Sequence, residues 1–399
     1  MTENKLRTSL ILLIGALGVL QPFSLDPYLP NLAAMAKDLN VDQGTIQQNL
    51  TFLTFGISIG TILIGPITDA VGRRKPVLVA LFGYIAAALI TATAATIEIL
   101  FAGRILQGMT AACLVIIANA MLRDLHEGIQ LIKAFALSMI VASSSWFIGP
   151  AFGSFLQTFT DWRGLSYILA TFAAALLVLI ALKLPDTMHI DSRTKSTAKQ
   201  VAIRFKHLAK DREFLGLLTV QSTISISLFS YLSVSPFVYD NAYQITPIQV
   251  GYFLALNSFT AYLGGQIGAR LSAKLSPSKA LTIGQIIGAL AGLGLIATAT
   301  LSLGFIAFTS LLALFTLGFG ITITPLVGMA MTKHPEEAGT AAAMVAVSGT
   351  LATTIAGGLY AVLDHNSSIG IGATMLGFMI LGIFLLYAVV KPNKMEAMK

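Results

Sequence analysis

Apolar stretches of about twenty residues, separated by short polar intervals, repeat along almost the whole chain. Because a helix of about twenty apolar residues spans the hydrocarbon core of a bilayer, each stretch predicts a transmembrane helix. The predicted helices are 8–33, 48–70, 76–97, 99–122, 134–158, 164–184, 214–238, 248–271, 280–301, 304–328, 338–363 and 370–390. We therefore expect an all-α membrane protein with twelve transmembrane helices.

The longest polar interval, at 186–212, divides these helices six and six. It predicts an N-terminal six-helix bundle at 1–185, a linker, and a C-terminal six-helix bundle at 213–399. Three apolar residues of the linker, Val201, Phe205 and Leu208, recur at helical spacing among basic residues. This part is either a helix lying on the membrane surface or a solvated linker. Two six-helix bundles joined by a long loop suggest parallel halves, each built of inverted three-helix units.

The composition supports lipid as the solvent of this chain. Hydrophobic residues make up 55% of its 399 positions and charged residues 11%, whereas soluble domains carry about a quarter charged residues. The first apolar stretch follows Lys5 and Arg7 as in a signal peptide. It lacks a small-x-small cleavage site, so we expect an uncleaved first helix.

The basic residues are distributed as in an inner-membrane protein. The net charge is +7, and with the N-terminus inside, all 25 Lys and Arg except Lys37, Arg104 and Arg163 fall on the cytoplasmic side. This is the positive-inside rule, so it predicts cytoplasmic termini and a cytoplasmic linker. The net positive charge therefore does not indicate a nucleic-acid partner.

Sequence patterns typical of enzymes and metal sites are missing or out of context. The chain has no phosphate-binding loop of the Walker A type. Gly56-Ile-Ser-Ile-Gly60 matches the G-x-S-x-G pattern, but it lies inside an apolar helix with no strand before it and no triad partners. The five histidines lie in loops or at helix ends without metal-ligand spacing. We expect no enzyme, metal or cofactor, and the lone Cys113 excludes a disulfide within one chain.

Two ionisable residues fall well inside the predicted membrane region, Asp26 in the first helix and Arg104 in the fourth. Each lies roughly 7–10 Å from the predicted outer boundary, at 1.5 Å per residue. An unpaired charge at that depth costs several kcal/mol, so such residues usually face a cavity or each other and are functional. The alternative is a purely structural salt bridge. An acid whose surroundings alternate between closed and open binds and releases a proton, which is the chemistry of a proton-coupled carrier.

A polar turn between the second and third helices combines glycines, an acid and a row of bases. Its residues are Gly65, Asp69, Gly72, Arg73, Arg74 and Lys75. The turn resembles the cytoplasmic signature of the major facilitator superfamily, although Ala70 stands where that family usually has a base. The resemblance implies a cytoplasmic gate in which Asp69 and Arg73 bridge neighbouring helices while the transporter is open to the outside. Because Ala70 carries no positive charge, the resemblance does not establish how strongly this gate is held closed.

Two further motifs resemble those of the same superfamily. Arg104-x-x-Gln107-Gly108 is similar to its fourth-helix motif, which is associated with proton coupling. Gly149-Pro150-x-x-Gly153 resembles its antiporter motif, with Ser145 and Ser154 in place of two glycines. That motif implies a bent fifth helix and an exporter.

Five segments extend the resemblance over nearly the whole chain. They are 26–30 (DPYLP), 122–124 (LRD), 161–163 (DWR), 230–239 (SYLSVSPFVY) and 251–257 (GYFLALN). Together they resemble the Bcr/CflA drug-resistance family among the drug:proton antiporters. The resemblance implies alternating-access export of drug-like or small metabolite molecules, since relatives export antibiotics, sulfonamides, dipeptides or siderophores. A dedicated siderophore or metabolite exporter and a nutrient–proton symporter are the alternatives, and we expect a monomer in contact with lipid.

Polar and aromatic residues within apolar helices are candidates for the substrate cavity. These are Tyr28, Gln107, Trp146, Tyr231 and Asn257. Gln107 shares a helical face with Arg104, and the resemblance places the fifth, seventh and eighth helices around the cavity. Packing or an interfacial position is the competing interpretation for each residue. A mostly apolar cavity with few polar anchors suits amphipathic molecules, including cationic ones.

Overall fold

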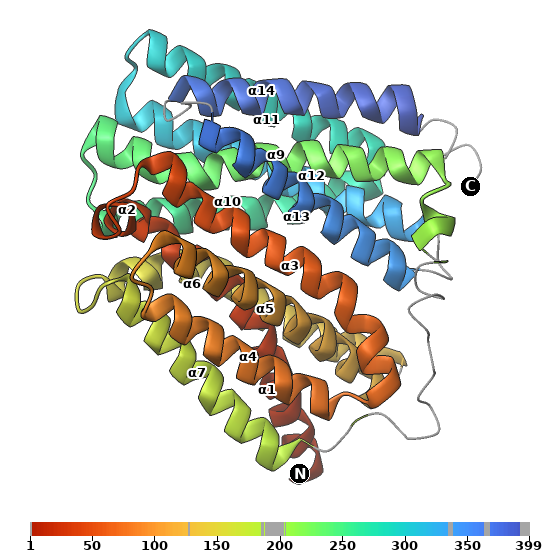
Figure 1. Cartoon of the computed structure of the whole chain (residues 1–399). Helices are drawn as coiled ribbons and strands as arrows, with labels where there is room; N and C mark the ends of the chain where they lie inside the picture. Colours follow the sequence, from red (N-terminus) through yellow and green to blue (C-terminus); the bar gives the residue numbers. More distant parts are fainter. Residues whose placement is uncertain are drawn as a thin grey trace. The chain divides into compact units, whose positions relative to one another are not determined.

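The computed structural model describes residues 2–126, 128–184, 187, 203, 205–333, 338–362 and 368–391. The chain divides into two compact units, Met1–Val201 and Ala202–Lys399. Helices of the first unit run from red to yellow-green in Figure 1, and those of the second from green to blue.

The first unit contains six membrane-spanning segments. Its elements are α1 (Thr2–Phe23), the 3₁₀ helix η1 (Asp26–Asn31), α2 (Leu32–Asp38), α3 (Gln43–Val71), α4 (Arg74–Ala92), α5 (Ile97–Leu125), α6 (Gly128–Leu156) and α7 (Trp162–Lys183). The first segment comprises α1, η1 and α2, and the other five are single helices.

The second unit also contains six spanning helices. They are α9 (Arg212–Tyr243), α10 (Pro247–Lys274), α11 (Pro277–Thr300), α12 (Gly304–Lys333), α13 (Ala338–Val362) and α14 (Ser368–Leu385). The last one continues as a π-helical turn, η4 (Leu386–Val390).

The twelve predicted helices therefore each correspond to a spanning segment, with ends that differ by at most about two helical turns. Ten segments of the described chain are long and apolar enough to cross a membrane. The other two, α6 and α10, have comparable lengths of 29 and 28 residues. Much of the linker expected at 186–212 lies outside the described residues, so its conformation stays a prediction.

The first spanning segment is interrupted at its prolines. Helix α1 ends at Phe23, directly after Pro22, and the chain continues through η1 with Pro27 and Pro30 before α2 begins. Proline has no backbone N–H, so each one removes a helical hydrogen bond and favours a break. The far end of the segment is fixed by Asp38, which forms an ion pair with Arg163 at the start of α7. The segment thus spans the unit as two helices joined by a 3₁₀ turn.

Polar residues mark where several helices begin. The side chain of Asp42 accepts a hydrogen bond of 2.8 Å from the Thr45 amide at the start of α3. The Thr45 hydroxyl and amide lower the pKa of this exposed carboxyl group. Asp161 caps α7 in the same way through the Gly164 amide. Such caps satisfy amide groups that have no partner within the helix.

Candidate functional site

The guanidinium group of Arg104 lies at the centre of a buried polar network in the first unit. Arg104 is 0% exposed. Its Nε donates to Asn49 Oδ1 of α3 at 2.7 Å. Its Nη1 donates to the Ser24 carbonyl oxygen at 2.8 Å and to Gln107 Oε1 at 2.9 Å. A buried cation is thus held by neutral dipoles contributed by three segments of the chain.

Two tyrosines complete this network. The Tyr28 ring covers the guanidinium, with Arg104 Cζ 3.7 Å from the ring centroid, and its hydroxyl bonds to Ser166 Oγ of α7 at 2.6 Å. The Tyr84 hydroxyl of α4 bonds to Ser24 Oγ at 2.8 Å. Desolvated cation–π contacts and charge-assisted hydrogen bonds are each worth about 2 kcal/mol. Together these contacts offset part of the cost of burying the charge.

Asp26 is not part of this network. It is the first residue of η1 and is half-buried. Among the residues that the structure describes, its carboxylate forms no hydrogen bond or ion pair, and every hydrogen-bond partner of Arg104 is neutral. The structure therefore does not show the structural salt bridge that the sequence left open as an alternative.

Asp26 lies in a longer candidate spanning segment than the sequence predicted. The predicted helix ended at residue 33, but the spanning segment extends through α2 and covers Leu10–Asp38. Asp26 is the seventeenth of the 29 residues of this segment. The expected depth of 7–10 Å was counted from residue 33, and the position of the membrane boundary along this longer segment stays a prediction. The carboxyl group is near the middle of the segment.

Helix α6 packs directly against the Asp26 segment through the two glycines of the antiporter motif. A Cβ atom added to Gly149 would lie 2.8 Å from Asp26 Cβ, and one added to Gly153 would lie 2.5 Å from Pro27 Cα. Pro150, the remaining residue of this motif, also lies inside α6. A hydrogen bond of 2.5 Å from Gln157 Nε2 of the following turn to Asn31 Oδ1 adds a polar contact at the end of η1. The motif thus lies where it can control the position of Asp26.

A second charged cluster lies at the turn between α3 and α4. Helix α3 ends at Gly72, whose φ of 90° is a backbone conformation that favours glycine. The following Arg73 is buried, and its Nε lies 3.0 Å from Asp124 Oδ2 at the end of α5. Its Nη1 donates to Thr68 Oγ1 at 2.9 Å. Arg74 donates to the Ala181 carbonyl oxygen at the end of α7 at 2.7 Å.

This cluster supplies a partner for Arg73 that the sequence did not predict. The described carboxylate partner is Asp124, which belongs to the segment Leu122-Arg-Asp124. The side chain of Asp69 lies outside the described part of the chain, so its bridge to Arg73 stays a prediction. No heavy atom lies within 4 Å of a Cβ added to Gly65, where the helix surface is open.

The five candidates for the substrate cavity divide between the units. Tyr28 and Gln107 are in the Arg104 network of the first unit. In the second unit, Asn257 Nδ2 of α10 donates to the Tyr231 hydroxyl of α9 at 3.0 Å, and both side chains are buried. The side chain of Trp146 lies outside the described residues. Four of the five candidates are thus found in two pairs, one pair in each unit.

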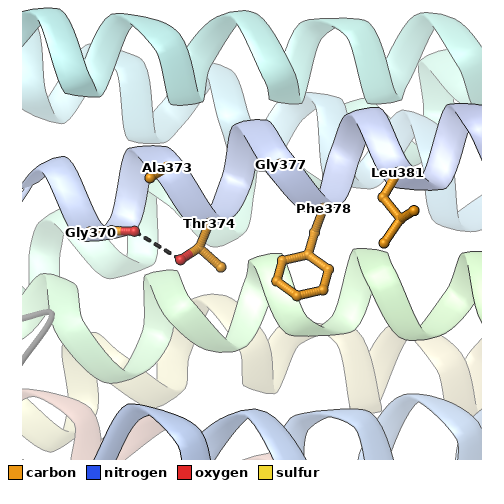
Figure 2. A pocket seen from close by; sticks show the side chains of 6 residues that line it. All are labelled: Gly370, Ala373, Thr374, Gly377, Phe378 and Leu381. Carbon is orange, nitrogen blue, oxygen red and sulfur yellow. Dashed lines mark hydrogen bonds between the residues drawn. The ribbon is translucent and has the colours of Figure 1, made fainter. Parts of the chain in front are cut away.

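Two hollows in the second unit do not involve any of these residues. A groove of about 330 Å³ runs along one face of α14, where Thr374, Phe378 and Leu381 project from the same side (Figure 2). A cavity of about 370 Å³ lies at the ends of α9, α11, α12 and α14. None of the described residues that line either hollow is charged.

Six-helix units of membrane-spanning length, one of them holding a buried cation and a separate acid, define a polytopic membrane transporter. The sequence model of the Major Facilitator Superfamily matches residues 12–357. The chain belongs to this superfamily, whose members transport solutes and are not enzymes.

Similar proteins include several named for drug resistance. The bicyclomycin resistance protein homolog of Haemophilus influenzae is 27% identical over 393 residues, covering 98% of this chain and 99% of that protein. Multidrug resistance protein D of Escherichia coli is 26% identical over 386 residues, covering 95% of both. The MFS-type transporter YdgK of Bacillus subtilis is 29% identical over 97% of both chains. The names of these relatives agree with the resemblance to the Bcr/CflA drug-resistance family.

Solved structures confirm the fold. A D-xylose–proton symporter superposes with a TM-score of 0.77 at 14% identity, covering 96% of this chain and 98% of its own. The peptide transporter POT superposes with a TM-score of 0.76 at 15% identity, covering 96% and 94%. At this level of identity the likeness concerns the major facilitator fold alone.

Proposed function

We propose that the protein is a proton-coupled antiporter that exports drug-like or small metabolite molecules across the bacterial inner membrane by alternating access. The drug-resistance names of the relatives support export. The observation that carries the proposal is the position of Asp26. Its carboxyl group lies near the middle of a spanning segment and has no ionic partner among the described residues.

A carboxyl group in that position can exchange a proton without breaking a salt bridge. Protonation removes a charge whose burial is unfavourable, and exposure to water restores it. Gly149 and Gly153 place α6 against the same segment, so a movement of α6 changes the surroundings of Asp26. We assign proton binding to Asp26 and assign to Arg104 the task of holding the broken first helix through the Ser24 carbonyl oxygen.

The energetics suit one proton per cycle. Inward movement of one proton charge gains about 2.3 kcal/mol per 100 mV of membrane potential, which supports a gradient of about fiftyfold for an uncharged solute. The proposal also includes cytoplasmic termini, based on the distribution of the 25 basic residues, and a monomeric transporter. A narrow siderophore or metabolite exporter would use the same proton site, and a nutrient symporter would use it with the opposite direction of solute flux.

The Asp26→Asn variant tests this assignment. Purified protein in vesicles is assayed with a substrate found by screening, once with an imposed pH gradient and once for downhill exchange. We expect loss of pH-driven export with downhill exchange retained, because asparagine resembles the protonated acid and cannot release a proton. Glu98→Gln is the matched control, since Glu98 is an exposed acid in the first turn of α5.

Two results would contradict the assignment in different ways. Full pH-driven export by Asp26→Asn would place proton coupling elsewhere and undermine antiport, since no other acid lies as deep in the predicted membrane region. Loss of folding and of both transport modes would indicate a structural role instead.

A further inference from the structure

Two nitrogen groups of the Arg104 network have no hydrogen-bond partner among the described residues. They are Nη2 of Arg104 and Nδ2 of Asn49, and both side chains are 0% exposed. A guanidinium group carries five N–H donors, and the hydrogen bonds of Nε and Nη1 use three of them. The N–H groups of Nη2 and Nδ2 are therefore buried and unpaired. We call these two nitrogen groups the donor pair.

The donor pair flanks a single hydrogen bond between α5 and α3. In this bond Arg104 Nε donates to Asn49 Oδ1 at 2.7 Å. Nη2 is bonded to the same Cζ atom as Nε, and Nδ2 is bonded to the same Cγ atom as Oδ1. Because the guanidinium is planar, one N–H of Nη2 points to the same side as the N–H of Nε. The unpaired donors therefore lie next to each other.

Close contact between α3 and α5 keeps the donor pair together. A Cβ atom added to Gly56 of α3 would overlap the Ile105 carbonyl oxygen of α5, and one added to Gly108 of α5 would overlap the Leu53 carbonyl oxygen of α3. Small residues permit such an approach of helix backbones in lipid. A ligand of the donor pair therefore meets donors that are already positioned, which lowers the entropic cost of binding.

The positive charge of Arg104 has no negative partner in this network. The contacts of the guanidinium are with Asn49, Gln107, the Ser24 carbonyl oxygen and the Tyr28 ring, all of which are neutral. The ion pairs in the described part of the chain do not involve Arg104. Burial of a charge without an opposite charge is unfavourable, and neutral contacts offset only part of that cost. The network therefore lacks both hydrogen-bond acceptors and a negative charge.

An anion matches the donor pair better than a water molecule does. A buried water makes about three hydrogen bonds, and its own hydrogens need acceptors. In the residues that contact Arg104, every described side-chain acceptor already takes part in a hydrogen bond. A halide ion accepts several N–H bonds, brings no hydrogen and supplies the missing charge. Hydrogen bonds between ionised groups are also about twice as strong as neutral ones.

We propose that the donor pair binds one chloride ion inside the first unit. The ion accepts hydrogen bonds from Arg104 Nη2 and Asn49 Nδ2 and compensates the charge of the guanidinium. Since both side chains are 0% exposed, the site selects a small monatomic anion over a larger organic one. This site is separate from the proposed proton site, because Asp26 is not a member of the donor pair.

Thermal unfolding of the purified full-length transporter in detergent tests the site, in sodium chloride and in sodium gluconate at the same ionic strength. Gluconate is an anion too large for an enclosed site. Broadening of the chloride NMR signal measures binding directly. The key variant is Asn49→Asp, whose carboxylate would face Nε and Nη2 of Arg104 as a built-in anion. The control Asn241→Asp makes the same change at an exposed position of α9.

We expect chloride to raise the unfolding temperature of the unaltered protein saturably, by about 1–4 °C at ten times the dissociation constant. Asn49→Asp should abolish both this rise and the broadening of the chloride signal. In gluconate it should unfold at or above the temperature of the unaltered protein, because its carboxylate replaces the ion. Asn241→Asp should keep the full response to chloride.

Three results would overturn the proposal. Equal unfolding temperatures of the unaltered protein in the two salts, without broadening of the chloride signal, would show that the donor pair binds no chloride. An equal response to chloride in Asn49→Asp and the unaltered protein would place the ion elsewhere. Failure of Asn49→Asp to fold, or a lower unfolding temperature in gluconate, would show that this position does not accept a negative charge.

These measurements involve no transport, so their outcome is independent of proton antiport. Chloride binding together with normal pH-driven export by Asp26→Asn would refute antiport and leave the chloride site standing. The reverse combination would refute the chloride site alone.

Discussion

The contact between α6 and the Asp26 segment can be tested by adding a single methyl group. In Gly153→Ala the new Cβ would lie 2.5 Å from Pro27 Cα and 2.7 Å from its carbonyl carbon, whereas ordinary contacts begin at 3.4 Å. The overlap is between the new Cβ of α6 and backbone atoms of Pro27, so no change of side-chain rotamer relieves it. Either η1 or α6 must move by about 1 Å, at a cost of about 1–3 kcal/mol typical of overpacking.

The matched control is Gly377→Ala in α14. No heavy atom lies within 4 Å of a Cβ added there, so the methyl group enters open space. Alanine is favoured over glycine inside a helix by up to about 1 kcal/mol, which makes this variant neutral or slightly stabilised. The same substitution thus has opposite expected effects at the two glycines, with a difference of about 1–4 kcal/mol.

Thermal unfolding of the two variants in detergent and pH-driven export from vesicles measure the two consequences. Gly153→Ala should unfold at a lower temperature than Gly377→Ala and export more slowly, because Asp26 moves with η1. If Gly153→Ala matched Gly377→Ala in both assays, α6 would not restrain the Asp26 segment, and the coupling between them would be refuted. Slower export at unchanged stability would locate the effect in the position of Asp26.

Two further predictions concern the membrane topology and the cytoplasmic gate. A cysteine introduced at Lys195 should resist a membrane-impermeant thiol reagent in intact cells and react in inverted vesicles; rapid labelling of intact cells would refute the topology. Asp69→Asn and Asp124→Asn should both reduce transport while substrate affinity stays within about twofold, because the Arg73 cluster lies at the end of the unit, away from Asp26. An equal loss of affinity would count against a gating role.

The fold was predictable because hydropathy reports burial in lipid directly. Every spanning segment has an apolar stretch of sufficient length. A glycine, a proline or a polar capping residue lies near most of the ends of these segments. The main discrepancy is the end of the first segment. Residues 34–38 contain the charged Lys37 and Asp38, which lower the local hydropathy, yet the structure continues the segment through α2 to Asp38, which is paired with Arg163. Such a long-range partner has no signal in local hydropathy.

The charged members of the site were predictable, but their neutral partners were not. Asp26 and Arg104 stand out because a charge within an apolar helix is costly and therefore rare. Ser24, Asn49 and Tyr84 carry no comparable signal, since serine, asparagine and tyrosine occur in many spanning helices for packing or capping. Asn49 follows Gln47 and Gln48 at the polar start of its helix, so no local feature sets it apart from its neighbours. Their importance follows from the meeting of three helices at Arg104.

The neutral environment of Arg104 bears directly on proton coupling. If Asp26 were the counter-ion of Arg104, each protonation would leave a buried cation without its partner, and breaking a buried ion pair costs about 3–5 kcal/mol. That cost would make proton binding less favourable by the same amount. Asn49, Gln107 and the Ser24 carbonyl oxygen bond to Nε and Nη1 of the guanidinium, and Nη2 has no hydrogen-bond partner among the described residues. Because none of these partners is Asp26, Asp26 can change its charge while these bonds persist. The same reasoning explains why Asp26→Asn is expected to fold, since it removes a buried charge without unpairing Arg104.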